Sequence, residues 1–182
     1  MRAINGTNHL GTCHHVGLDG TDGDYDGGNV DRSAIQWLKL QLSSGAVTMS
    51  HSSHGRLYHS ASSNPCWYYM PSIAVNAAGD MVLGFSGSRA TEHIGAFFAG
   101  QTAGGVTTNP YLVQAGGAYY AYATQTTPPD SGPGVRWGDY SFTCLDPDGN
   151  RFWTVQEYAE IELGYPAATA WRTWIMTLAL PQ

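Results

Sequence analysis

An internal repeat limits the folds open to this chain more than any other feature. Two stretches 70 residues apart align without a gap, so that Trp67 falls on Trp137 and Gly79 falls on Gly149. In each copy, two apolar runs flank a short turn that contains the glycine and is rich in Asn or Asp. Glycine readily adopts a positive φ, and Asn and Asp tolerate one, so the pattern predicts a β-hairpin. A hairpin used twice predicts a repeated supersecondary unit.

The alignment also predicts the register of the strand that follows the turn. It places Val82 on Phe152 and Leu83 on Trp153. A fainter third copy lies upstream, with Asn8-His9-Leu10 at the turn and the second strand. Its first strand is missing, so on this pattern the chain starts inside a unit.

Each unit is expected to contain up to four short antiparallel strands, joined in order. The expected strands are 8–16, 33–41 and 46–50 in the first unit, 70–76, 80–87, 94–101 and 107–114 in the middle unit, and 139–145, 150–157 and 170–178 in the last. Four-stranded antiparallel units in series are typical of a β-propeller. The expected fold class is therefore all-β: a partial β-propeller of about two and a half four-stranded blades. It forms a single segment, 1–182, with units at about 8–50, 70–114 and 139–178.

A closed propeller usually needs about four to eight blades, so this chain is too short to close one. The missing blades would come from a larger protein of which the chain is a fragment, or from other copies of the chain. Loop lengths distinguish the two ends of the units, because the turns at 76–80 and 146–150 are tight. The long loops gather at the other end, which is where repeat folds usually bind ligands: 17–32, 51–69, 115–138 and 158–169.

Composition excludes several classes of protein. The 8 Lys and Arg residues form no basic stripe and the net charge is −6, so nucleic acid is not an expected partner. No apolar run approaches the roughly 18 residues of a membrane span. Abundant glycine, 12% aromatic residues and one lysine are typical of exported bacterial β proteins. We therefore expect an extracellular or cell-surface location, although the first residues of this chain contain no apolar signal-peptide core.

The three cysteines are Cys13, Cys66 and Cys144. An odd number leaves at least one thiol free. Two arrangements are open: one disulfide with one free thiol, or three free thiols buried in strands.

Two stretches of the sequence resemble a known family. They are Met70-Pro71-Ser72-Ile73-Ala74-Val75-Asn76 with Gly79-Asp80-Met81-Val82-Leu83-Gly84-Phe85-Ser86, and Arg136-Trp137-Gly138-Asp139-Tyr140-Ser141 with Asp146-Pro147 and Phe152-Trp153-Thr154-Val155-Gln156-Glu157-Tyr158. Both resemble the sialidase-like, neuraminidase-repeat β-propellers of secreted bacterial proteins, over roughly residues 8–180. The resemblance implies a propeller and an exported origin. It assigns no activity, because one fold hosts many functions.

The Asp-box of sialidases, Ser-x-Asp-x-Gly-x-Thr-Trp, is only half met. Asp148-Gly149-Asn150-Arg151-Phe152-Trp153 supplies its Asp and its final Trp, whereas Asp146 stands in place of the Ser and Phe152 in place of the Thr. In that family the box caps a hairpin turn and is not an active site.

Four polar residues are the first candidates for contact with a ligand. Arg136, Asp139 and Tyr140 lie where a long loop enters the last unit, and Glu157 ends a strand on the same side. An arginine can bind a carboxylate, and carboxylates accept hydrogen bonds from hydroxyl groups. In the alternative interpretation, an Arg136–Asp139 pair satisfies buried polar groups near the propeller axis.

Two aromatic residues are further candidates for ligand binding. Trp67 and Tyr69 lie on the side with the long loops, where exposed rings could stack on the apolar C–H faces of sugars. The alternative is packing between blades, since Trp67 and Trp137 occupy matched positions in the repeat.

An acidic loop is the candidate metal site. Asp22, Asp24 and Asp26 alternate along the chain and Gly27 follows them, so their oxygens could converge on calcium. The twelfth position of the loop is Ser33 rather than the bidentate Glu of an EF-hand. The alternative is a solvated acidic loop without a metal.

Together these features predict an extracellular binding or scaffold module for a glycan or another cell-surface ligand. No complete catalytic constellation is present in the chain. The alternative is part of a sialidase-like glycoside hydrolase whose remaining catalytic residues lie outside this chain. Such an enzyme needs an arginine cluster, a Tyr–Glu nucleophile pair and an acid Asp, and the Arg-Ile-Pro signature of sialidases is absent here.

Overall fold

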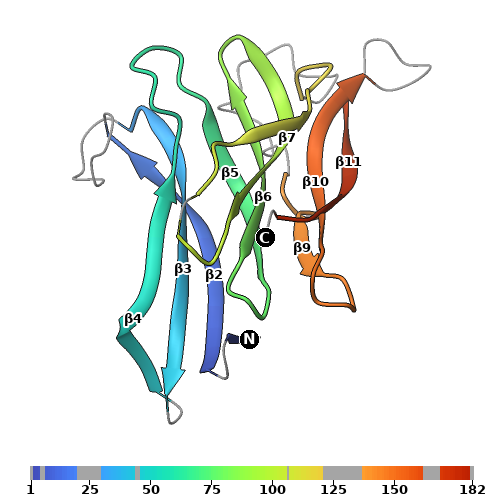
Figure 1. Cartoon of the computed structure of the whole chain (residues 1–182). Helices are drawn as coiled ribbons and strands as arrows, with labels where there is room; N and C mark the ends of the chain where they lie inside the picture. The colour runs from blue at the N-terminus through green and yellow to red at the C-terminus, as the bar shows by residue number, and fades with distance from the viewer. Residues whose placement is uncertain are drawn as a thin grey trace.

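The computed structural model describes residues 2–4, 7–19, 30–43, 46–105, 107–120, 137–161 and 169–180. Every regular element among these residues is a β-strand. The strands form three antiparallel sheets, which we call the first, middle and last sheet (Figure 1). This confirms an all-β fold with three antiparallel units. Among the described residues the sheets do not close into a ring, so the propeller itself stays a prediction.

The strands follow the chain order within the first two sheets. The first sheet contains β1 (Arg2–Ile4), β2 (Thr7–Leu18), β3 (Arg32–Ser43) and β4 (Ala46–Leu57). The middle sheet contains β5 (Trp67–Val75), β6 (Met81–Arg89), β7 (Glu92–Gln101) and β8 (Tyr111–Gln114). The last sheet contains β9 (Phe142–Leu145), β10 (Phe152–Ile161) and β11 (Thr169–Leu178), with β10 in the centre.

The first unit does have a first strand, contrary to the prediction from the sequence. β1 pairs antiparallel with β2, with Ile4 opposite Thr7. A strand of three residues is too short to produce a periodic pattern, so the repeat comparison missed it. Several other strands extend into stretches predicted as loop, most of all β4, which continues to Leu57, and β10, which continues to Ile161.

The repeated hairpin has a different register in its two copies. In the middle sheet Asn76 N donates to Asp80 O at 2.9 Å, and Val75 lies opposite Met81. In the last sheet the turn is one residue longer: Asp146 N donates to Arg151 O at 2.9 Å, and Leu145 lies opposite Phe152.

The extra residue changes the correspondence between the strands that follow the turns. Phe152 corresponds to Met81, and the predicted match of Val82 to Phe152 is wrong. The match of Leu83 to Trp153 fails for the same reason. A shift of one residue moves every side chain of a strand to the other face, which the gapless alignment could not show.

The middle sheet lies between the other two (Figure 1). Strands β2 and β3 contact β5 on one side, and β9 and β10 contact β5, β6 and β7 on the other. The central strand β6 is therefore buried on both faces from Met81 to Gly87. Its alternating side chains meet two different environments, one in each neighbouring sheet.

The interface between the first and middle sheets is apolar. Met81, Leu83 and Phe85 of β6 are fully buried there and belong to one hydrophobic cluster. The other members of the cluster come from both sheets: Ile35, Trp37, Leu57, Cys66, Tyr68, Val75, Phe97 and Ala99. Burial of one such large side chain stabilises the fold by about 1.5–3 kcal/mol, so this cluster is the core of the molecule.

The interface between the middle and last sheets contains a network of polar side chains. The hydroxyl groups of Ser72 and Thr143 share a hydrogen bond of 2.6 Å, and those of Thr143 and Thr154 share one of 2.8 Å. Gln156 Nε2 donates to Ser72 Oγ at 2.9 Å and to Thr154 Oγ1 at 2.7 Å. Gly84 allows this approach, because a Cβ at that position would collide with both Thr154 and Gln156. The two sheets are thus joined by a buried network of hydrogen bonds.

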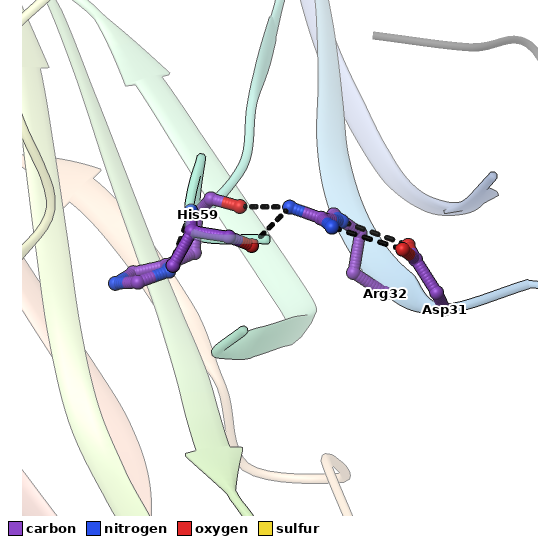
Figure 2. Close-up of polar contacts among 4 residues, drawn as sticks. Asp31, Arg32 and His59 are labelled. Atoms are coloured by element: carbon purple, nitrogen blue, oxygen red, sulfur yellow. Dashed lines mark hydrogen bonds and ion pairs between the residues drawn. The ribbon is translucent and has the colours of Figure 1, made fainter. Parts of the chain in front are cut away.

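A buried arginine fixes the connection from the first sheet to the middle sheet. Arg32 is 1% exposed, and its Nε and Nη2 donate to the two carboxylate oxygens of Asp31 at 2.8 and 2.9 Å. Its Nη1 donates to the carbonyl oxygens of His59 at 2.6 Å and Ala61 at 2.9 Å. Figure 2 shows the guanidinium group between the Asp31 carboxylate and the His59 carbonyl. Because Arg32 has both a paired charge and main-chain partners, it acts as a clamp on the segment that leads into β5.

Candidate functional site

A buried carboxylate organises the segment before β9. Glu157 of β10 is 1% exposed. Its Oε2 accepts a hydrogen bond from Gly138 N and its Oε1 one from Tyr140 N, both at 2.8 Å. Main-chain N–H groups replace the water that a buried carboxylate loses. Glu157 therefore fixes the backbone that carries Asp139 and Tyr140.

A kink in β5 supports the same segment from the middle sheet. The pairing of β5 with β6 is irregular between Tyr69 and Ser72, and Met70 has a φ of +50°. Gly138, with a φ of +93°, lies directly against Met70, and a Cβ on Gly138 would collide with that side chain. A non-glycine residue at positive φ is strained and persists only where its surroundings hold it. Here the strained Met70 packs against the turn that Glu157 binds.

Trp137 is positioned by a hydrogen bond and by a ring contact. Its Nε1 donates to Ser86 Oγ at 3.1 Å, and Ser86 Oγ in turn donates to Glu157 O at 3.0 Å. The ring of Tyr120 meets the Trp137 ring edge to face, at 5.1 Å between centroids. The polar interface between the middle and last sheets thus continues into the site.

These residues line a cavity of about 210 Å³. Tyr140 and Trp171 stack at 4.7 Å between centroids, with 20° between their planes. Tyr140 is 55% exposed and Trp171 40% exposed, so this wall of the cavity faces solvent. The full lining is Tyr120, Trp137, Gly138, Asp139, Tyr140, Glu157 and Trp171. We call it the aromatic–acidic pocket.

The structure brings together part of the predicted site. Asp139, Tyr140 and Glu157 all line the aromatic–acidic pocket. Trp67 and Tyr69 do not line it: Trp67 begins β5 at 37% exposure, and the Tyr69 hydroxyl bonds to Ser88 Oγ at 2.9 Å. Burial raises the pKa of Tyr69 to about 12. The binding roles of these five residues stay predictions.

Other predicted site residues lie outside the described residues. These are Arg136 and the candidate calcium ligands Asp22, Asp24 and Asp26. Within the described ranges, no group of three or more His, Cys, Asp or Glu side chains could hold a metal ion.

Three aromatic residues of the pocket were not among the predicted site residues. Trp171 of β11 lies opposite Ala159 of β10. Tyr120 reaches the site because Gly117 N donates to Ala159 O at 2.8 Å, which holds the segment after β8 against β10. Trp137 was recognised only as a repeat position. No local pattern shows that three rings from separate segments meet, because the sheet packing decides it.

All three cysteines are free, so the arrangement with one disulfide is wrong. Cys66 is buried and Cys13 packs against the apolar cluster. Burial raises the pKa of Cys13 to about 12 and that of Cys66 to about 11, so both are inert thiols at neutral pH.

Comparison with family models, with curated proteins and with solved structures found no match to this chain. No helix in the part of the chain that the structure describes has the length and apolar character needed to cross a membrane.

Proposed function

We propose that this chain is an extracellular binding module of the β-propeller type and that its aromatic–acidic pocket binds a sugar ring. The observation that carries the proposal is the stacked pair of Tyr140 and Trp171 at the mouth of a cavity that also contains two carboxyl groups. Aromatic rings pack against the apolar C–H faces of sugars, and carboxylates accept hydrogen bonds from their hydroxyl groups.

The size and rigidity of the pocket support a small ligand unit. A cavity of about 210 Å³ lies below the roughly 300–1,000 Å³ of pockets for drug-sized ligands. The Glu157 carboxylate and the Ser86 hydroxyl hold its walls in place. The site is therefore already ordered, and binding costs less conformational entropy. We infer that one ring of a glycan enters while the rest of the chain stays outside.

Three serial antiparallel sheets, each packed on the next, support the propeller. The apolar surface of the last sheet supports further blades, from a longer protein or from other copies of this chain. Phe142 and Ile175 are 63% and 62% exposed, and both lie opposite Val155, so they share one sheet face. A large exposed apolar patch marks a surface that packs against something.

Binding is favoured over the alternative of a sialidase-like hydrolase by the state of Glu157. The hydrolase would need a carboxylate that activates a tyrosine nucleophile. Both oxygens of Glu157 instead accept main-chain N–H groups. The carboxylate therefore holds the loop, and its remaining lone pairs can accept hydrogen bonds from a ligand.

The test is a glycan-binding measurement with two matched tryptophan variants. Trp171 and Trp174 are both 40% exposed on β11, but they lie three residues apart and so face opposite sides of the strand. Binding to a panel of immobilised oligosaccharides is measured for the wild type, Trp171→Ala and Trp174→Ala. We expect Trp171→Ala to lose at least about tenfold in affinity, by analogy with the stacking of a nucleic-acid base on an aromatic side chain, which is worth about 1–3 kcal/mol. Trp174→Ala should bind as the wild type does.

The proposal fails if the folded wild type binds no member of the panel. It also fails if both variants lose affinity equally, because a general loss of stability would then explain the result. Thermal melts of all three proteins show whether each is folded at the assay temperature.

A further inference from the structure

We propose that the aromatic–acidic pocket selects its sugar by charge, binding an amino sugar most tightly, a neutral sugar less tightly and a sugar carboxylate least. This inference rests on the proposed sugar-binding function and names the class of ligand. It opposes what the resemblance to sialidases implies, because their substrate carries a carboxylate.

The first support is the hydrogen bonding of Glu157. Each of its two oxygens accepts a main-chain N–H, and neither contact requires a protonated oxygen. Hydrogen bonds donated to both oxygens favour the charged carboxylate form. Two peptide dipoles offset only part of a unit negative charge. A negative potential therefore remains at the inner wall of the pocket.

The second support is the chemistry of the rest of the lining. The faces of Trp137, Tyr140 and Trp171 are the negative part of their ring quadrupoles, which attract a cation within about 6 Å. Asp139 adds a second carboxyl group to the lining. No basic side chain lines the pocket among the described residues.

The third support is the enclosure of the site. Glu157 lines the pocket and is 1% exposed, so solvent screens its charge less than it screens a surface carboxylate. A protonated amine on the sugar then gains both the Coulomb attraction and the contact with the rings. A carboxylate on the sugar meets repulsion from the same groups.

The experiment compares sugars that share one ring and differ in charge. Methyl glucosaminide, methyl glucoside and methyl glucuronide carry +1, 0 and −1 at about pH 6, and the galacto-configured series repeats the comparison. Affinities are measured by calorimetry on the whole chain in low salt. We expect about a three- to tenfold loss of affinity at each step from amine to neutral sugar to carboxylate. Added salt should bring these affinity ratios closer to one, because it screens the charges.

Two variants locate the source of the selection. In Asp139→Asn the negative charge is removed while the shape is kept, so the ratio of amino-sugar to neutral-sugar affinity should fall. Glu157→Gln is less suitable, because it would also release the loop. Arg136→Gln tests the residue that lies outside the described part of the chain, and we expect the same order of the three ligands in this variant.

Each outcome separates this inference from the proposed function. If the glucuronide or galacturonide binds most tightly and Arg136→Gln abolishes that preference, the charge selection is wrong while sugar binding stands. Equal affinities in all three members would also overturn the charge selection alone. If none of the six glycosides binds to the folded protein, both the sugar-binding function and the inference fail.

Discussion

The two faces of the middle sheet make contacts of different chemistry. Facing the first sheet, β6 presents Met81, Leu83 and Phe85 to a closed apolar cluster. Facing the last sheet, the same strand presents Gly84 to the Thr154 hydroxyl and the Gln156 amide, and Ser86 to the Trp137 indole N–H and the Glu157 carbonyl. Both faces are fully buried, so burial alone does not distinguish them.

The difference separates the interface that supplies most of the stability from the interface that carries the proposed binding site. Apolar contacts are non-directional, so the first interface tolerates small shifts and supplies most of the folding free energy. Hydrogen bonds need defined distances and angles, so the second interface adds less net stability but sets positions closely. The aromatic–acidic pocket is built on the second interface, where Ser86 and Glu157 hold Trp137 and the loop before β9.

The sharpest test of this comparison uses two adjacent residues of β6. Phe85 stacks on Phe97 at 5.9 Å and meets Tyr68 edge to face at 5.1 Å. Phe85→Ala should lower the free energy of unfolding by about 3–5 kcal/mol, because it leaves a cavity in the core. Its neighbour Ser86 is equally buried but faces the other sheet. Ser86→Ala should cost only about 1–2 kcal/mol, since it removes hydrogen bonds to Trp137 and Glu157.

Chemical denaturation gives both stabilities, and sugar affinity gives the second contrast. We expect Ser86→Ala to lower the affinity for the sugar. Phe85→Ala, where it is still folded, should bind the sugar with unchanged affinity. The comparison breaks if the serine variant loses as much stability as the phenylalanine variant.

The polar network should be more sensitive to one missing partner than to complete replacement. Thr154→Val keeps the shape but removes the hydroxyl that bonds to Thr143 and Gln156. We expect a loss of about 1–3 kcal/mol, because buried donors lose their acceptor. Gln156 Oε1 already has no donor among the described residues.

Replacing the set with apolar residues of similar shape should therefore cost less than the sum of the single variants. The combination is Ser72→Ala, Thr143→Val, Thr154→Val and Gln156→Met, measured by denaturant unfolding against each single change. Purely additive losses would show that the network contributes as independent bonds.

Alkaline pH should weaken the apolar interface selectively. Burial raises the pKa of Cys13 to about 12 and of Cys66 to about 11, and it raises the pKa of Tyr68 as well. For a group whose pKa is higher in the folded state, the stabilisation is complete below the unfolded pKa and is lost as the pH rises toward the folded pKa. Stability should therefore fall from about pH 8.5 upward, with each of the two cysteines contributing a loss of roughly 1–2 kcal/mol at about pH 10.

Thermal melts between pH 7 and pH 11 measure this loss. A variant with Cys13→Ala and Cys66→Ala is less stable at neutral pH, but its stability should depend less on alkaline pH. If the stability of that variant falls with rising pH as steeply as that of the wild type, groups other than these two cysteines cause the alkaline sensitivity.

The smallest effect is expected at the hairpin turn of the last sheet. The hydrogen bond from Trp153 Nε1 to Asp146 Oδ2, at 2.7 Å, lowers the pKa of Asp146. The folded pKa lies below the unfolded value, so this contribution is present above about pH 4 and is lost as the pH falls through the folded pKa. The melting temperature of Asp146→Asn should therefore depend less on pH in the acid range than that of the wild type.

Trp153→Phe is the control for the acid effect, since it removes the indole donor and keeps the carboxylate. It should reduce the acid dependence in the same way. If the melting temperatures of both variants depend on acid pH as strongly as that of the wild type, the Asp146–Trp153 pair is not the cause of the dependence.

The sequence predicted local structure better than it predicted the site. Both hairpin turns were recognised, and Gly79 and Gly149 have the expected positive φ of +95° and +75°. The register after the second turn was predicted wrongly, because one extra residue in a turn leaves the local pattern intact while it reverses the faces of β10. Asp139, Tyr140 and Glu157 were identified as neighbours in a cluster, but the two N–H groups bound to Glu157 are main-chain groups that no residue pattern reveals.

What the amino-acid sequence determined by itself is the class of structure: strands, tight turns at Gly79 and Gly149, and a repeated antiparallel unit. These follow from φ preferences and alternation over a few residues, which are local properties. Only the tertiary structure decided that Tyr120, Trp137 and Trp171 share one pocket. Their chain positions lie far apart, and the packing of the last sheet on the middle sheet brings them to one pocket.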